Sequence, residues 1–72
     1  MIVFEIDGEF IELFKLLKAE GLCENGAQAK AAVSSGEVLV GGQVETRKRH
    51  KLRPGVIVEY AGETIKISKK IE

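Results

Sequence analysis

Residues 36–55 read GEVLVGGQVETRKRHKLRPG, and the rest of the chain is organised around this stretch. Val38 and Val40 alternate as in a strand, and Gly41-Gly42 predicts a tight hairpin turn into a returning strand. Pro54-Gly55 occupies the central positions of a predicted type II turn. Before that turn, seven consecutive positions hold five cations and one histidine. These are Arg47, Lys48, Arg49, His50, Lys51 and Arg53. Within the same run, Leu52 is the predicted buried anchor.

The net charge of the 72-residue chain is zero, but the charges are unevenly distributed along it. Residues 1–25 carry two lysines and six acids, a net charge of −4, whereas residues 26–72 carry nine cations and five acids, a net charge of +4. Such a separation can present a basic face to a polyanion, so neutrality does not exclude a nucleic-acid ligand. Because clustered cations repel one another, an anion-binding loop is favoured over a merely solvated one.

Length and composition favour a single domain over residues 1–72, with a small core. Hydrophobic residues make up 44% of the chain and charged residues 31%, which is a globular and not a disordered composition. The one cysteine, Cys23, can form no internal disulfide, and a buried filler is favoured over a reactive thiol. We see neither a signal peptide nor an apolar stretch of membrane-spanning length, so a soluble cytoplasmic protein is expected.

An edge strand and a helix are predicted at the start of the chain. Residues 1–6 alternate loosely between apolar and acidic positions, as an edge strand does. Residues 9–20 carry apolar side chains at the helical spacing i, i+3, i+4 and i+7, with Asp7 as the predicted N-cap. This apolar stripe consists of Phe10, Leu13, Phe14 and Leu17. Gly21 is expected to end the helix with a positive φ.

A second, shorter helix leads into the central stretch, and two strands follow it. Asn25 is a good N-cap, and Gln28 three residues later completes the pattern of a capping box. Gly36 is expected to end this helix. After the Pro-Gly turn, residues 56–60 and 64–68 read as two further strands.

The order of these motifs resembles the RNA-binding domain named after small-subunit ribosomal protein four, the S4 domain. No single motif is specific, but the ordered set is, and it spans most of the chain. The residues that carry the resemblance are Leu13, Leu17, Gly21-Leu22, Ala29, Val33, Gly36, Val38, Val40, Gly42 and Leu52-Arg53-Pro54-Gly55. Length and the run Glu45-Thr46-Arg47-Lys48-Arg49 look like the short stand-alone bacterial members, the YbcJ family.

The resemblance implies an α+β fold with the αL arrangement, in which two packed α-helices lie against a small, mostly antiparallel sheet. RNA would lie across the helix junction and the hairpin. The chain departs from the family pattern where many members carry Arg-Leu-Asp, because it reads Glu12-Leu13-Phe14. It also has Gly26 where many members carry an arginine after the second cap. Two arginines that contact RNA in many members are therefore missing, which shifts the expected contacts onto residues 47–53.

The basic run supplies the first group of candidate RNA-binding residues. If the run is extended, Arg47, Arg49 and Lys51 lie on one side of it and Lys48 and His50 on the other. Arginine can form bidentate phosphate contacts and stack on bases. His50 is expected to be mostly neutral at pH 7 and available for stacking or hydrogen bonding.

The start of the second helix supplies the other candidates: Asn25, Gly26, Gln28 and Lys30. Free backbone N–H groups and the positive end of the helix dipole can hold a phosphate there. Gly26 would leave the backbone open to approach, or it simply eases a turn. Lys30 lies one turn further on and either reaches the same ligand or is solvated. Tyr60 is a candidate for base stacking or for the rim of the core.

Nothing in the sequence indicates catalysis, a metal site or a cofactor. His50 and Cys23 have no second histidine or cysteine to join them in binding a metal. The hydroxyl side chains lack a plausible base, and the nucleotide-binding fingerprints are absent. A chain of this length is also too short to enclose a sizeable pocket.

The sequence therefore predicts a non-catalytic RNA-binding protein, with a monomer as the default state and no membrane partner. It would capture structured RNA, ribosomal RNA among the candidates, by backbone and shape. The alternative is a protein-interaction adaptor that uses the acidic first helix, with Glu9, Glu12 and Glu20, together with the basic loop. Exposed apolar residues on the sheet would favour the adaptor. A ubiquitin-like carrier is a weaker third candidate, because the chain ends Lys70-Ile71-Glu72 and not in Gly-Gly.

Overall fold

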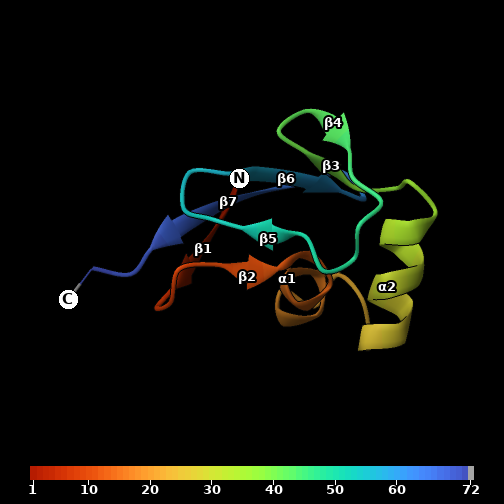
Figure 1. Cartoon of the computed structure of the whole chain (residues 1–72), viewed down its shortest axis with the longest axis horizontal. Coiled ribbons are helices and arrows are strands. Elements are labelled where there is room, and N and C mark those ends of the chain that lie inside the picture. Colours follow the sequence, from red (N-terminus) through yellow and green to blue (C-terminus); the bar gives the residue numbers. More distant parts are fainter. Residues whose placement is uncertain (72) are drawn as a thin grey trace.

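A computed structural model describes residues 1–71 of the chain, and Figure 1 shows its helices on one side of a twisted sheet. The elements in chain order are β1 Ile2–Ile6, β2 Ile11–Glu12, α1 Leu13–Ala19, α2 Gly26–Ser34, β3 Leu39–Val40, β4 Gln43–Val44, β5 Lys51–Leu52, β6 Ile57–Tyr60 and β7 Glu63–Lys69. The predicted α+β class with two packed helices is confirmed.

The main sheet has the strand order β1-β7-β6-β3-β4, and a second small sheet pairs β2 with β5. β1 runs parallel to β7, whereas the remaining pairs are antiparallel, so the sheet is mostly antiparallel as predicted. β1 also forms an edge of the sheet, as predicted. Ile2 and Phe4 pair with Ile65 and Ile67, which places these four apolar side chains on the inner face.

The first helix is shorter than its sequence pattern predicts. We expected residues 9–20, but α1 begins at Leu13, and Ile11–Glu12 is an extended strand paired with β5. The side chain of Glu12 does not cap the helix. Instead, the backbone N–H groups of Leu13 and Phe14 donate to the carbonyls of His50, at 2.9 Å, and Lys48, at 3.0 Å. A distant part of the chain thus satisfies two of the free donors at the helix start, and the helix begins there.

The second helix follows its sequence signals closely. The Oδ1 atom of Asn25 accepts the backbone N–H of Gln28 at 2.8 Å, as an N-cap does. The Gln28 side chain in turn accepts the backbone N–H of Glu24, one residue before the position that the capping box predicts. Gly36 follows the last helical turn with φ = +78° and redirects the chain into β3.

Both predicted turns around the basic run are present. Gly41 and Gly42 have φ values of +59° and +83° and join β3 to β4 in the register Leu39↔Val44, as a two-residue hairpin turn requires. At the other end, the Val56 N–H donates to the carbonyl of Arg53 at 3.1 Å, and Gly55 has φ = +98°. These are the features of the expected type II turn.

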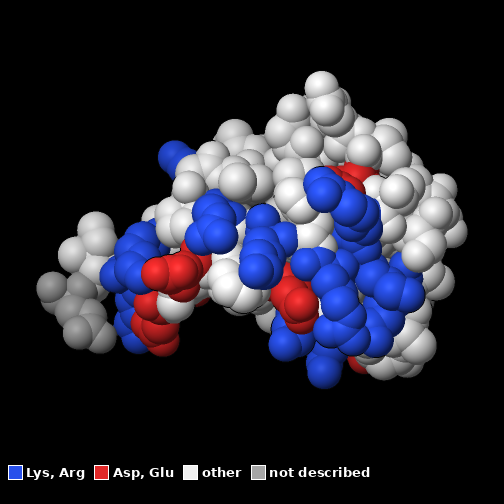
Figure 2. Space-filling model, viewed as in Figure 1, with Lys and Arg blue, Asp and Glu red and all other residues white. Residues whose placement is uncertain are grey.

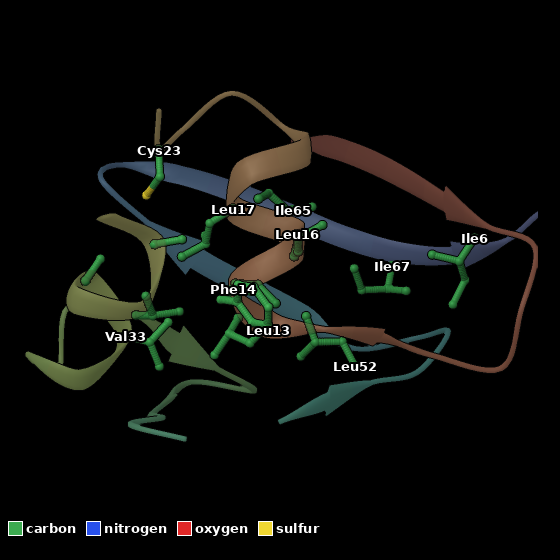
Figure 3. Packing of buried hydrophobic residues seen from close by; sticks show 14 residues of the cluster. Ile6, Leu13, Phe14, Leu16, Leu17, Cys23, Val33, Leu52, Ile65 and Ile67 are labelled. Carbon is green, nitrogen blue, oxygen red and sulfur yellow. The ribbon is translucent and has the colours of Figure 1, made fainter. Parts of the chain in front are cut away.

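The core lies between the two helices and the inner face of the sheet. Figure 3 shows Leu13, Leu16 and Leu17 of α1 in the same cluster as Ile65 and Ile67 of β7. Leu52 of β5 belongs to this cluster and is fully buried, so its predicted role as anchor is confirmed. Cys23 is a buried filler, as expected, with its Sγ atom 3.9 Å from the hydroxyl of Tyr60. Within residues 1–71, neither helix is long and apolar enough to cross a membrane.

Candidate functional site

The basic loop, residues 47–53, is fixed against the start of α1. Its second half pairs with β2 in the register Ile11↔Leu52 and Glu12↔Lys51. Its first half provides the two carbonyls that accept the N–H groups of Leu13 and Phe14. Hydrogen bonds and the buried Leu52 side chain therefore hold the loop backbone in place. This fixes the positions from which the cationic side chains extend.

The loop is turned and not extended, because the N–H of His50 donates to the carbonyl of Arg47 at 3.0 Å. The expectation that His50 lies apart from Arg47, Arg49 and Lys51 is therefore wrong. All four side chains, together with Arg53, line one open hollow of about 520 Å³. Lys48 is exposed and does not line it. The turn thus brings five of the six predicted loop residues around a single space.

Figure 2 shows this concentration of charge on one face of the molecule. The blue atoms of Lys and Arg gather over the region where β5 and the basic loop lie in Figure 1. Red atoms of acidic residues lie among them. The face is therefore basic, with some of its charge offset internally.

Phe14 joins the basic loop to the start of α2. Phe14 is 8% exposed, and the Arg49 guanidinium lies 5.4 Å and the Lys30 ammonium 4.8 Å from its ring centroid. A Cβ atom added at Gly26 would lie 3.8 Å from the same ring. Cations over an aromatic face are attracted by its quadrupole. The sequence pattern placed Phe14 only in the core. Its second role could have been inferred from the family comparison, because Phe14 stands where many members carry aspartate.

Phe10 is a second aromatic residue that sequence reasoning missed at this site. We predicted it in the apolar stripe of a helix, but it precedes β2 and is 39% exposed. The ammonium of Lys51 lies 4.9 Å and the guanidinium of Arg53 5.9 Å from its ring centroid. The site therefore contains two aromatic rings: Phe14 lies near Arg49 of the basic loop and Lys30 of α2, and Phe10 lies near Lys51 and Arg53 of the basic loop.

Two carboxylates offset part of the basic charge. Glu45 accepts hydrogen bonds from the Nε and Nη2 atoms of Arg47 at 2.9 and 3.0 Å, and lies 3.7 Å from Nδ1 of His50. Glu12 lies 3.6 Å from Arg49 and 3.4 Å from Lys15. Within residues 1–71, the following cations have no carboxylate within 4 Å: Lys30, Lys48, Lys51 and Arg53. Within residues 1–71, Glu12 is thus the one acid of the acidic first segment, residues 1–25, that forms an ion pair with the basic loop.

The remaining predicted residues lie at the start of α2. Asn25 and Gln28 are exposed, and their side-chain oxygens already accept backbone N–H groups of the capping turn. Lys30 and Gly26 face the Phe14 ring and so lie beside the basic loop. Tyr60 instead packs at the rim of the core against Cys23.

The bidentate contact with Arg47 lowers the pKa of Glu45 from 4.5 to about 2, and the field of His50 acts in the same direction. A lowered folded-state pKa stabilises the fold above about pH 4.5, and that stabilisation is lost as the pH falls toward 2. We expect Glu45→Gln to destabilise the protein at pH 7 and to converge with the natural protein near pH 2. Urea unfolding over a pH series measures this difference.

Arg47→Gln is the matched variant for this experiment, because it removes the largest cause of the lowered pKa and leaves the Glu45 carboxylate in place. It should lose most of the pH-dependent part of the stability and keep the part that His50 and the backbone N–H of residue 47 provide. A difference between Glu45→Gln and the natural protein that stays constant from pH 5 to pH 2 would contradict the assignment.

Comparison with known proteins identifies the family. Residues 4–68 match the model of the S4 domain. YbcJ of Escherichia coli strain K12, named as a candidate RNA-binding protein, is 51% identical over 57 residues, which cover 79% of this chain and 81% of YbcJ. RlbA of Bacillus subtilis strain 168, named a probable ribosome maturation protein, is 39% identical over 79% of this chain and 80% of its own length.

The solution structure of YbcJ from E. coli is described as revealing an αL motif involved in RNA binding. It superposes with a TM-score of 0.72 at 45% identity and covers 94% of this chain and 87% of that one. The fold, the order of the motifs and the relatives all indicate the same family. The chain therefore belongs to the S4 domain family, a non-enzymatic class of fold.

Proposed function

We propose that this protein binds structured RNA, ribosomal RNA included, and catalyses no reaction. One observation carries the proposal. Backbone hydrogen bonds hold the basic loop against β2 and the start of α1, and five side chains of the loop line one open hollow. Because the loop is ordered before binding, little conformational entropy is lost when a ligand arrives. The names of YbcJ and RlbA point to RNA and to the ribosome, which would place the protein in the cytoplasm.

The cations of the site divide into two groups with different roles. Lys48, Lys51 and Arg53 face no carboxylate within 4 Å in residues 1–71, and so they offer their full charge to phosphates. Arg47 and Arg49 are held in place by Glu45 and Glu12 and present their remaining donors in fixed directions. The unpaired cations would attract the RNA, and the two paired arginines would orient it.

The start of α2 extends this surface. Lys30 and Arg49 both lie over the Phe14 ring, so an RNA backbone that crosses the basic loop would meet Lys30 on the way to the start of α2. We include Asn25, Gly26, Gln28 and His50 as further contacts. Recognition would depend on backbone and shape, because the edges of A-form base pairs are hidden in the deep major groove.

A salt series with a labelled RNA hairpin tests the proposal. Each neutralised phosphate releases counterions, so four phosphate contacts predict a slope of about −3 to −4 in a plot of log affinity against log salt. Fluorescence anisotropy from low to above physiological salt would measure this slope. No binding by the natural protein at low salt would overturn the proposal.

A second candidate function is protein docking on the outer face of the sheet. Val3 and Ile57 both pair with Lys66 in register, and they are 57% and 36% exposed. Val44, on β4, is 58% exposed. Exposed apolar residues on a sheet favour a protein partner. Failure of RNA binding at low salt would move this candidate to first place.

A further inference from the structure

Phe10 is an aromatic residue that the fold leaves at the surface. The chain has three phenylalanines. Phe14 is buried, and Phe4 packs against the core cluster. Within residues 1–71, Phe10 belongs neither to the buried cluster nor to the side chains packed against it, and it is 39% exposed. The packing of the core therefore does not explain why this position carries a ring.

The neighbours of Phe10 are set by the small sheet of β2 and β5. Ile11 pairs with Leu52 in an antiparallel register, so Phe10 and Arg53 are the next residues outward on the two strands. Leu52 is fully buried and anchors this pair. Arg53 and Lys51 both lie over the Phe10 ring, and both also line the open hollow. Phe10 is therefore at the edge of the surface proposed to bind RNA.

We propose that Phe10 is a stacking platform for an unpaired base of the bound RNA, with Lys51 and Arg53 holding the adjacent phosphates. This inference rests on the proposed function and narrows its ligand. A base inside a continuous A-form helix is already stacked on its neighbours and cannot reach a protein ring. An exposed phenylalanine among cations suits an unpaired base, because every base has a face that stacks. The ligand is then a helical RNA interrupted by an unpaired nucleotide.

The competing explanation is that Phe10 serves only to hold Lys51 and Arg53 in place. In that case its removal weakens the binding of every RNA by a similar factor. A stacking platform acts differently, because its removal weakens the binding of RNA with an unpaired base more than the binding of a continuous duplex. The ratio of two affinities therefore separates the two roles.

The experiment compares two RNAs, a continuous duplex and the same duplex with one unpaired adenosine in the middle. Anisotropy would give both affinities for the natural protein, Phe10→Ala and Phe10→Trp. We expect the natural protein to prefer the interrupted duplex by about tenfold or more, from one stacked base. Phe10→Ala should lose this preference and bind both duplexes equally within about twofold, whatever affinity it loses for both RNAs through Lys51 and Arg53. Phe10→Trp should keep the preference.

The tryptophan variant also provides a direct signal, because the chain contains no other tryptophan. Its fluorescence should be quenched by the interrupted duplex and not by the continuous one, and this decides the question even if Phe10→Ala fails to fold. Equal affinity of the natural protein for both RNAs, a preference that survives Phe10→Ala, or equal quenching by both RNAs would overturn the inference. Those results leave RNA binding intact, whereas no binding of either RNA at low salt overturns the proposed function as well.

Discussion

Replacing Lys48, Lys51 and Arg53 together by glutamate is expected to weaken RNA binding at low salt by at least about a hundredfold. These three cations have no carboxylate within 4 Å in residues 1–71, so their charge is available to phosphates. The change removes three attractive contacts and adds three repulsive ones. It should also flatten the dependence of affinity on salt, because fewer counterions are released. Anisotropy with the RNA hairpin over a salt series would measure both effects.

Charge reversal at these three residues is a better test than charge reversal of the whole basic loop. A glutamate in place of Arg47 or Arg49 would face Glu45 or Glu12 and would put the fold at risk. The matched control is Lys18→Glu, Lys66→Glu and Lys70→Glu, which makes the same charge change at exposed positions outside the site. Lys70 lies 3.9 Å from the exposed Asp7, and a surface ion pair of this kind contributes little to stability. We expect this control to retain most of the affinity. Equal losses in the two variants would show that net charge, and not the basic loop, governs binding.

Leu52→Ala is expected to lower the free energy of unfolding by about 2–5 kcal/mol. Leu52 is fully buried and belongs to the same cluster as Leu13 and Leu16 (Figure 3). A chain of this length has a total stability of roughly 4–11 kcal/mol, so the substitution removes a large part of it. Urea unfolding followed by circular dichroism would measure the loss.

Val44→Ala is the control for this change, because Val44 is 58% exposed and its truncation should cost about 0.5 kcal/mol or less. The variant Leu52→Ala should also bind RNA more weakly under conditions where it is still folded, since the pairing of β5 with β2 positions Lys51 and Arg53. A loss of stability no greater than that of Val44→Ala would show that Leu52 does not anchor the basic loop.

Local signals in the sequence predicted much of the fold correctly. Asn25 caps α2, Gly36 ends it, and Gly41-Gly42 and Pro54-Gly55 form the two expected turns. Each of these features depends on the backbone preferences of a few neighbouring residues, which a sequence shows directly. The order of these signals was also enough to suggest the family, which the comparisons confirmed.

The sequence did not predict pairing between segments that are far apart in the chain. Phe10 stands at the correct helical spacing from Leu13 and Leu17, so the apolar pattern extended the helix to residue 9. In the structure, β5 pairs with residues 11 and 12, and loop carbonyls accept the first donors of α1. These hydrogen-bond partners are distant in the sequence, so a pattern of neighbouring residues does not predict them. The prediction of the first helix boundary was wrong for this reason.

The sequence by itself therefore determined the second helix with its cap, the turns, the fold class and the concentration of positive charge in residues 47–53. Only the tertiary structure decided how that charge is presented. It turned the basic loop at Arg47–His50, surrounded Phe14 with Arg49 and Lys30, and left Phe10 exposed beneath Lys51 and Arg53. The physical reason is that caps and turns are set by adjacent residues, whereas the shape of the site is set by hydrogen bonds and packing between segments far apart in the chain.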